Sequence, residues 1–183
     1  TGVIDRRGKI QKELDNRRIR FDEHGIGEYV LAFKEEYNLE NDITVNEVDI
    51  DNFIRAKGAI YSGASVLLQS LGMDFSVIDK VYIAGGIGNS LNIENAITIG
   101  LLPDVEREKF QYIGNSSLVG SYLALISRDA KNKLEEIASQ MTYVELSVYP
   151  GYMDEFVSAC FLPHTNIDNY PTVKQKLLER GLL

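Results

Sequence analysis

The order of local patterns in the second half of the chain most constrains its fold. Residues 81–84 form a short apolar run that ends in the pair Gly85-Gly86, which is typical of a buried strand followed by a tight turn. A helical pattern of apolar residues follows, and Pro103 prevents its continuation. The same order recurs after residues 110–113, with a second glycine turn and a second helical pattern. This repeated strand, turn and helix favours an α/β fold.

Patterns in the first half add a strand and a long helix. The apolar residues 29–33 predict a strand. Apolar residues then recur at spacings of three and four over 50–71, which predicts the longest helix of the chain. Thr44 or Asn46 is placed to cap its start, and Gly72 is placed where a helix ends.

The rest of the chain is predicted from similar patterns. We expect a helix over 128–141, a strand over 142–148 and another helix within 153–160. The composition turns polar after that helix. We therefore expect residues 1–163 to form one lobe of a domain and residues 164–183 to form a peripheral tail with a short helix.

Composition excludes several classes of protein. The net charge of -8, from 19 basic and 27 acidic residues, would repel a phosphate backbone, so we expect no nucleic-acid partner. The longest apolar runs are far shorter than the roughly 20 residues of a membrane-spanning helix, so we expect a soluble, cytoplasmic protein without a membrane partner. Cys160 is the only cysteine, and His24 and His164, expected in exposed loops, are the only histidines. We therefore expect no internal disulfide, no all-cysteine cluster and no histidine-rich zinc site.

The first glycine loop is the most informative candidate site. Gly85, Gly86 and Gly88 would let the backbone approach a ligand and expose its N–H groups, and Ile87 and Asn89 complete the loop. No Gly-Lys-Ser/Thr follows, so the loop is not a Walker A motif. The alternative is that these glycines only turn the chain between a strand and a helix.

Two further residues are candidate ligand contacts. Lys57 lies on the apolar stripe of the long helix, where its ammonium could lie beside a nucleotide or could reach water over an apolar stem. Asn115, at the second glycine turn, could contact a ligand or could simply cap the following helix. Asp49 and Asp51 fall in the first turn of the long helix, where acids complement the helix dipole. The sequence therefore presents no catalytic residue.

Most of the chain resembles one family. Residues 54–63, 81–89 and 92–103 closely resemble the C-terminal part of the ATP-dependent reductive activators of corrinoid proteins, and further similarity covers 110–117, 142–146 and 153–163. These activators belong to the superfamily of actin, sugar kinases and heat-shock chaperones, whose nucleotide lies between two ribonuclease-H-like lobes. The resemblance implies an incomplete ribonuclease-H-like lobe of an actin-like ATPase, with a mixed sheet flanked by helices.

The resemblance also implies a nucleotide site. In this superfamily the strand that ends in Gly-Gly carries the adenosine-binding motif, which falls here on Gly85 and Gly86. The chaperones carry Arg-Ala-Lys on the helix beside the adenosine, and Arg55-Ala56-Lys57 is similar. ATP with Mg²⁺ is the implied cofactor. The family's phosphate-binding loops and its [2Fe–2S] domain have no counterpart in this chain and are expected upstream of it.

The implied function is that of the adenosine-side lobe of an ATPase that restores cobalt(I) in a corrinoid protein. That protein would belong to a methyltransferase system of an anaerobe, in acetyl-CoA synthesis or with an O-demethylase. The corrinoid protein is the expected partner, the full-length protein is expected as a homodimer, and this chain alone is expected to be inactive. Two alternatives remain, which are a non-catalytic recognition module that docks onto the corrinoid protein and a kinase-like enzyme for a small metabolite.

Overall fold

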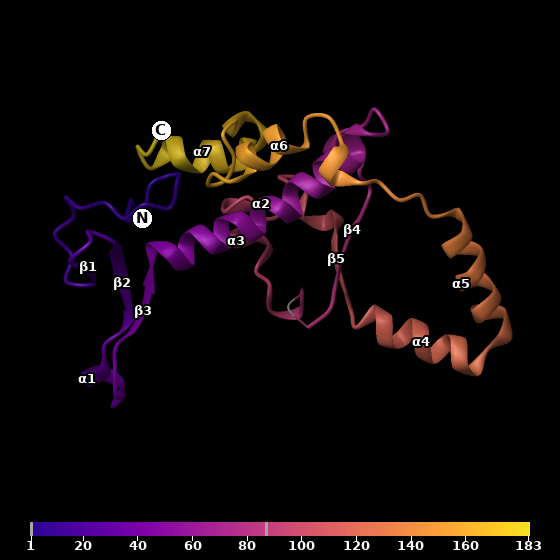
Figure 1. Ribbon diagram of the computed structural model, residues 1–183, viewed down its shortest axis with the longest axis horizontal. Coiled ribbons are helices and arrows are strands. Elements are labelled where there is room, and N and C mark those ends of the chain that lie inside the picture. Colours follow the sequence, from indigo (N-terminus) through magenta and orange to yellow (C-terminus); the bar gives the residue numbers. More distant parts are fainter. Residues whose placement is uncertain (1, 87) are drawn as a thin grey trace.

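The computed structural model describes residues 2–86 and 88–183 and shows a mixed α/β chain built around one long helix (Figure 1). An antiparallel sheet in the order β1-β2-β3 precedes that helix, and the parallel pair β4–β5 follows it. The strands are β1 (Ile19–Phe21), β2 (Gly27–Ala32), β3 (Ile43–Asn46), β4 (Val81–Ala84) and β5 (Phe110–Gly114). The α-helices are α1 (Lys34–Tyr37), α2 (Glu47–Gln69), α3 (Ile93–Thr98), α4 (Ser116–Ile126), α5 (Arg128–Gln140), α6 (Tyr152–Ala159) and α7 (Pro171–Glu179). The α/β prediction is confirmed.

The long helix α2 begins and ends as its sequence predicts. The Asn46 side chain accepts hydrogen bonds from the backbone N–H groups of Val48 and Asp49, and the Asp49 carboxylate accepts from the Asn46 N–H, forming a capping box. Gly72 follows the last turn with a φ of +68°, a conformation that glycine adopts without strain. Asp49 therefore has the capping role expected of an acid in the first turn.

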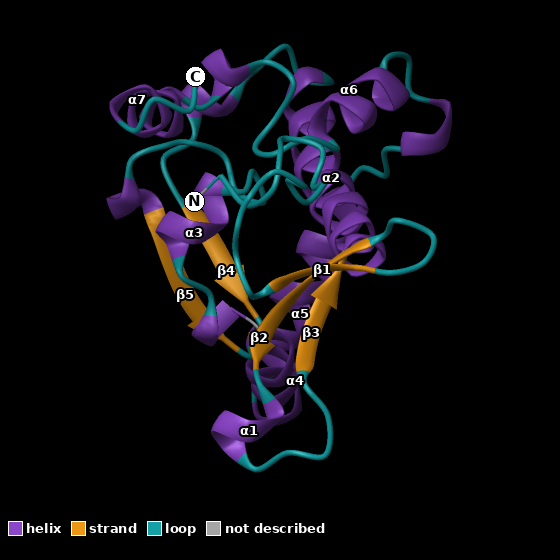
Figure 2. Cartoon of the chain, turned by 90° about the vertical axis from the view of Figure 1, so that its left-hand side faces the viewer, coloured by secondary structure: helices purple, strands orange, loops and turns teal. Residues whose placement is uncertain are grey.

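The strands β4 and β5 are direct neighbours, although α3 lies between them in sequence. Val81 pairs with Phe110, and Ile83 pairs with Tyr112. Figure 2 shows this pair apart from the antiparallel sheet, with α6 and α7 on the opposite side of the molecule from both sheets. Because the two strands are parallel, the glycine turns that follow them come to the same edge.

One predicted strand is absent from the described part of the chain. Residues 142–148 form a loop that ends in a 3₁₀ turn over Leu146–Val148. The Glu145 carboxylate accepts hydrogen bonds from the Ser147 hydroxyl at 2.6 Å and from the Ser147 N–H at 3.3 Å, which stabilises this local turn. The prediction was wrong because a strand needs a neighbouring strand for its backbone groups, and an apolar pattern does not provide one.

The hydrophobic core joins α2, α3, α6 and the chain around α7. Its buried members are Tyr61, Ile97, Ala159, Tyr170 and Val173. The last two come from residues 164–183, which we expected at the periphery. This segment therefore contributes to the core, while the domain boundary after residue 163 stays a prediction.

The helices α4 and α5 lie away from this core, at the end of the molecule opposite the antiparallel sheet (Figure 1). Apolar side chains of α4 are exposed, with Tyr122 60%, Ile126 62% and Leu125 85% accessible. No described element covers them. Among the described residues, no helix combines the length and the apolar character needed to cross a membrane.

Gly100, just after α3, allows a close approach to the segment that follows α6. Its φ is +78°, and a Cβ added there would overlap the carbonyl oxygen of Pro163, with the carbonyl carbon only 2.7 Å away. Gly72 also has a positive φ, but no atom lies within 4 Å of its Cβ position. An alanine at Gly72 would therefore meet conformational strain alone, whereas an alanine at Gly100 would meet both strain and steric overlap.

We expect Gly100→Ala to lower the free energy of unfolding by about 2–5 kcal/mol. About 1–2 kcal/mol comes from placing alanine in the left-handed backbone conformation, and about 1–3 kcal/mol comes from overpacking. Gly72→Ala is the matched control, and it should lose only the conformational part. Urea denaturation followed by circular dichroism measures both. Equal losses in the two variants would contradict a close approach of Gly100 to Pro163.

Candidate functional site

The two glycine turns lie next to each other at the carboxyl ends of the parallel strands. Gly85 follows β4 with a φ of +89°, and Gly114 ends β5 with a φ of +64°. The backbone N–H of Gly85 donates a hydrogen bond of 2.8 Å to the carbonyl oxygen of Gly114. Open α/β sheets bind ligands outside the carboxyl ends of their strands. This edge is therefore the candidate ligand site.

The space around the turns is open at three glycines. Among the described residues outside its immediate chain neighbours, no atom would lie within 4 Å of a Cβ added at Gly85, Gly86 or Gly114. Gly88 differs, because it is buried and a Cβ there would lie 2.8 Å from Cγ2 of Ile83. The first three glycines leave the backbone accessible to a ligand, whereas Gly88 allows the loop to pack against β4.

Two predicted contacts in this loop cannot be placed. Ile87 lies outside the described residues. Asn89 belongs to the 3₁₀ turn Gly88–Ser90, but its side chain lies outside the description. Ligand contacts for both stay predictions.

Asn115 lies beside Gly114 and caps α4. Its side-chain oxygen accepts a hydrogen bond of 3.0 Å from the backbone N–H of Leu118. This is the N-cap arrangement, the alternative that the sequence left open. The residue is exposed at the same edge as the glycine turns. A contact with a ligand there stays a prediction.

Lys57 lies in a different place, between α2 and the segment that follows α6. The side chain is 1% exposed, and its Nζ donates hydrogen bonds to the carbonyl oxygens of Phe161 and, at 2.6 Å, of Pro163. Gly58 allows this close packing, because a Cβ there would lie 3.0 Å from Sγ of Cys160. Burial lowers the pKa of Lys57 from its ordinary value of 10.5 to about 8. No hydrogen bond joins Lys57 to the described part of the glycine loop, so its contact with a nucleotide stays a prediction.

Arg6 also binds this segment, a contact that the sequence does not indicate. Its Nη2 donates hydrogen bonds to the carbonyl oxygens of His164 and, at 3.1 Å, of Thr165. Its own carbonyl accepts a bond of 2.8 Å from the N–H of Leu162. The only hint of this contact in the sequence is the adjacent pair Arg6-Arg7. That pair does not indicate that Arg6 would bind a residue 158 positions away.

His164 is buried rather than exposed in a loop, which corrects the sequence-based expectation. It is 3% exposed, its ring lies 5.5 Å from that of Tyr61, and its Nε2 lies 3.9 Å from a carboxylate oxygen of Glu155. Burial lowers its pKa below the ordinary value. His24 is exposed, as expected.

Metal-ligating side chains are not grouped in the described part of the chain. No cluster of three or more histidine, cysteine, aspartate or glutamate residues there could hold a metal ion. Cys160 is a free thiol whose pKa is raised by burial.

This arrangement, with sheets flanked by helices and glycine turns at the carboxyl ends of parallel strands, is that of an actin-like domain, the ASKHA domain. The family model described as the C-terminal domain of RACo, the ASKHA domain, matches residues 1–174. The chain belongs to this family.

Two relatives agree with this assignment. The chain is 30% identical over 162 residues to a protein of Eubacterium limosum named corrinoid activation enzyme RamQ, with 85% of the chain and 27% of the relative covered. It is 51% identical to a solved structure named reductive activator for corrinoid, iron-sulfur protein, with a TM-score of 0.84 and coverage of 93% of the chain and 27% of that protein. The chain thus spans about a quarter of the length of these relatives.

The buried Lys57 predicts a pH-dependent stability. Between the lowered pKa of about 8 and the ordinary 10.5, the unfolded state binds more protons than the folded state, so stability should rise with pH. The free energy of unfolding, relative to that of Lys57→Met, should increase by about 2 kcal/mol from pH 7 to pH 10. Urea denaturation at both pH values measures this change. Lys80→Met, which alters an exposed lysine, is the control. The difference in free energy of unfolding between the unmodified protein and Lys80→Met should not change with pH. If it increased as much as the difference from Lys57→Met, a buried amine at Lys57 would be contradicted.

Proposed function

We propose that this chain is the adenosine-side ATP-binding lobe of an ATP-dependent activator that restores cobalt(I) in a corrinoid protein. One observation carries the proposal, which is the open edge formed by the adjacent turns at Gly85-Gly86 and Gly114. Backbone that no side chain covers can approach a planar, polar ligand closely. The relatives named as activators of corrinoid proteins support the choice of a corrinoid protein as the target.

The residues at this edge fit the adenosine half of a nucleotide. Gly85 and Gly86 lie on the β4 side and Gly114 on the β5 side, so a ligand at this edge would contact both turns. Asn115 would border the site while it caps α4. ATP with Mg²⁺ supplies the phosphoryl chemistry when bound, and the groups that hold the phosphates would lie elsewhere in the longer protein. The residues of this chain would bind and orient the nucleoside.

Lys57 has a positioning role in this proposal. Its amine is bound to the carbonyls of Phe161 and Pro163, so it holds α2 against the segment that follows α6. The helix is thereby fixed in the lobe that carries the glycine turns. Loss of Lys57 would then act on the nucleotide site through the stability of the lobe.

In the proposed activity, nucleotide binding changes the affinity of the activator for a corrinoid protein in the cytoplasm. Cobalt(I) has a very low potential, so its restoration needs free energy beyond that of ordinary electron donors. A nucleotide can supply that energy only through a difference in affinity between two states of the complex. The electron would come from a [2Fe–2S] domain outside this chain.

A recognition module that docks onto the corrinoid protein is the second candidate. One observation favours it, which is the exposed apolar surface of α4, where Leu125 is 85% accessible. Exposed apolar patches on proteins often mark interaction sites. Such a module would fold and dock without binding a nucleotide.

The glycine edge predicts a specific loss of ATP affinity. Gly86→Val places a branched side chain in the open edge, where its Cβ has no neighbour within 4 Å among the described residues outside its immediate chain neighbours, so we expect the variant to fold. We expect ATP·Mg²⁺ to bind the variant at least tenfold more weakly, about 1.4 kcal/mol, in a version of the protein extended by the phosphate-binding lobe. Isothermal titration calorimetry measures both proteins.

Gly120→Val is the matched control, because Gly120 is a glycine of α4 that also has no atom near its Cβ position. Its affinity for ATP·Mg²⁺ should equal that of the unmodified protein. If the extended protein does not bind ATP, or if Gly86→Val binds as tightly as the control, the nucleotide site is not at this edge. Absence of binding together with docking onto the corrinoid protein would support the recognition module.

A further inference from the structure

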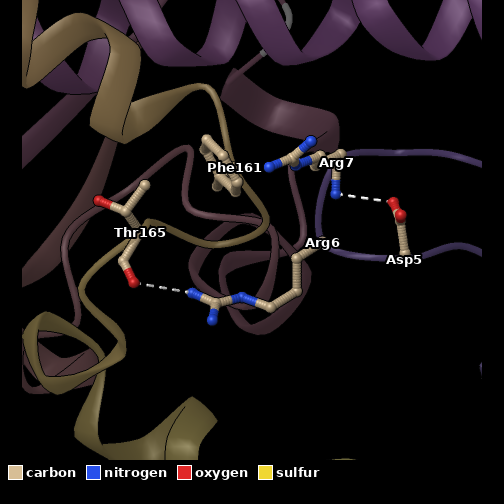
Figure 3. Close-up of a pocket in the computed structure, with 5 residues that line it drawn as sticks. All are labelled: Asp5, Arg6, Arg7, Phe161 and Thr165. Carbon is tan, nitrogen blue, oxygen red and sulfur yellow. Dashed lines mark hydrogen bonds between the residues drawn. The ribbon is translucent and has the colours of Figure 1, made fainter.

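A cavity of about 370 Å³ lies between the start of the chain and the segment that follows α6. Its lining comprises Asp5, Arg6, Arg7, Phe161 and Thr165. Figure 3 shows the guanidinium of Arg7 directed toward the ring of Phe161 and that of Arg6 directed toward Thr165. Two positive groups and an aromatic ring therefore surround one hollow, in a chain with a net charge of -8.

Neither guanidinium forms an ion pair with a carboxylate of the described residues. The Asp5 carboxylate, the nearest acid in the lining, already accepts hydrogen bonds from the backbone N–H groups of Arg7 at 2.8 Å and Lys9 at 2.9 Å. Other arginines of the chain do form ion pairs with carboxylates, namely Arg17, Arg18, Arg20, Arg55 and Arg107. The two positive charges of Arg6 and Arg7 thus exceed the one negative charge of Asp5 in the lining, and neither guanidinium is paired with that carboxylate.

Arg6 also retains an unused donor. Its Nη2 is bound to the carbonyls of His164 and Thr165, but its Nε is buried and has no acceptor among the described residues. Because Nε is closed to solvent, a ligand in the cavity would not reach it. Nη1 forms no hydrogen bond with the described residues either, and it is the donor that a ligand could use.

We propose that this cavity binds the phosphate or carboxylate group of a small organic molecule. Guanidinium groups bind such oxyanions through paired N–H donors, and they do so more strongly than neutral donors. The ring of Phe161, which Arg7 contacts at 5.7 Å, provides an apolar wall for the rest of the molecule. A volume of about 370 Å³ suits a small ligand.

The site is separate from the proposed nucleotide edge, and neither proposal depends on the other. It contains none of the glycine-turn residues. A ligand would join the first residues of the chain to the segment at Phe161 and Thr165. Because it would bind the folded state, it would also stabilise the contact that Arg6 already makes there.

Arginine Nε–H resonances in ¹H–¹⁵N spectra test the proposal. Inorganic phosphate and acetate are each titrated into the chain at constant ionic strength, with chloride as the reference anion. We expect saturable shifts of the Arg6 and Arg7 resonances with at least one of the two oxyanions. A response to phosphate alone indicates an organic phosphate as the ligand, and an equal or larger response to acetate indicates a carboxylate.

Variants establish where the anion binds. Arg7→Gln keeps the carbonyl contacts of Arg6, so it should fold and should weaken oxyanion binding at least tenfold, as seen at the Arg6 resonance. Arg128→Gln removes one positive charge from α5 and should leave the affinity unchanged. Shifts that chloride reproduces, or an affinity that Arg7→Gln and Arg128→Gln change equally, would overturn the proposal.

Discussion

The turn that follows α6 depends on two cations that bind its backbone carbonyls. Lys57, from the middle of α2, binds the carbonyls of Phe161 and Pro163, and Arg6, from the start of the chain, binds those of His164 and Thr165. These carbonyls lie just beyond the end of a helix, where unpaired acceptors accumulate and positive groups are favoured. A short segment thereby joins three parts of the chain that are distant in sequence.

Much of the packing around the core follows from this turn. Gly58 lets α6 approach α2, and Gly100 lets the end of α3 approach Pro163. His164 lies against Tyr61, whose ring in turn lies 5.7 Å from that of Tyr170. The residues after the turn are therefore part of the core, even though their composition is polar.

The glycine edge and the turn serve different purposes in one lobe. The edge at Gly85, Gly86 and Gly114 has open backbone and belongs to the parallel strands, where ligands of α/β folds bind. The turn has buried charges and fixes α2, α3 and α6 against one another. Membership of the corrinoid activator family gives the edge its proposed ligand, and the rigid turn would keep that edge in place.

The sequence by itself determined several local elements of this protein, but it did not predict β1 or β3. Helical spacing with the Asn46 cap predicted α2, and the repeated strand, glycine turn and helix predicted β4, β5 and the fold class, because these signals act over a few residues. It also named Gly85, Gly86 and Asn115 as candidate ligand contacts, which stay predictions. Only the tertiary structure decided that 142–148 is not a strand and that His164 is buried, since both depend on distant partners. The tertiary structure also decided what Lys57 binds. A lysine on an apolar stripe can reach water, a ligand or a carbonyl oxygen. The carbonyls that it binds belong to residues 104 and 106 positions away in the sequence.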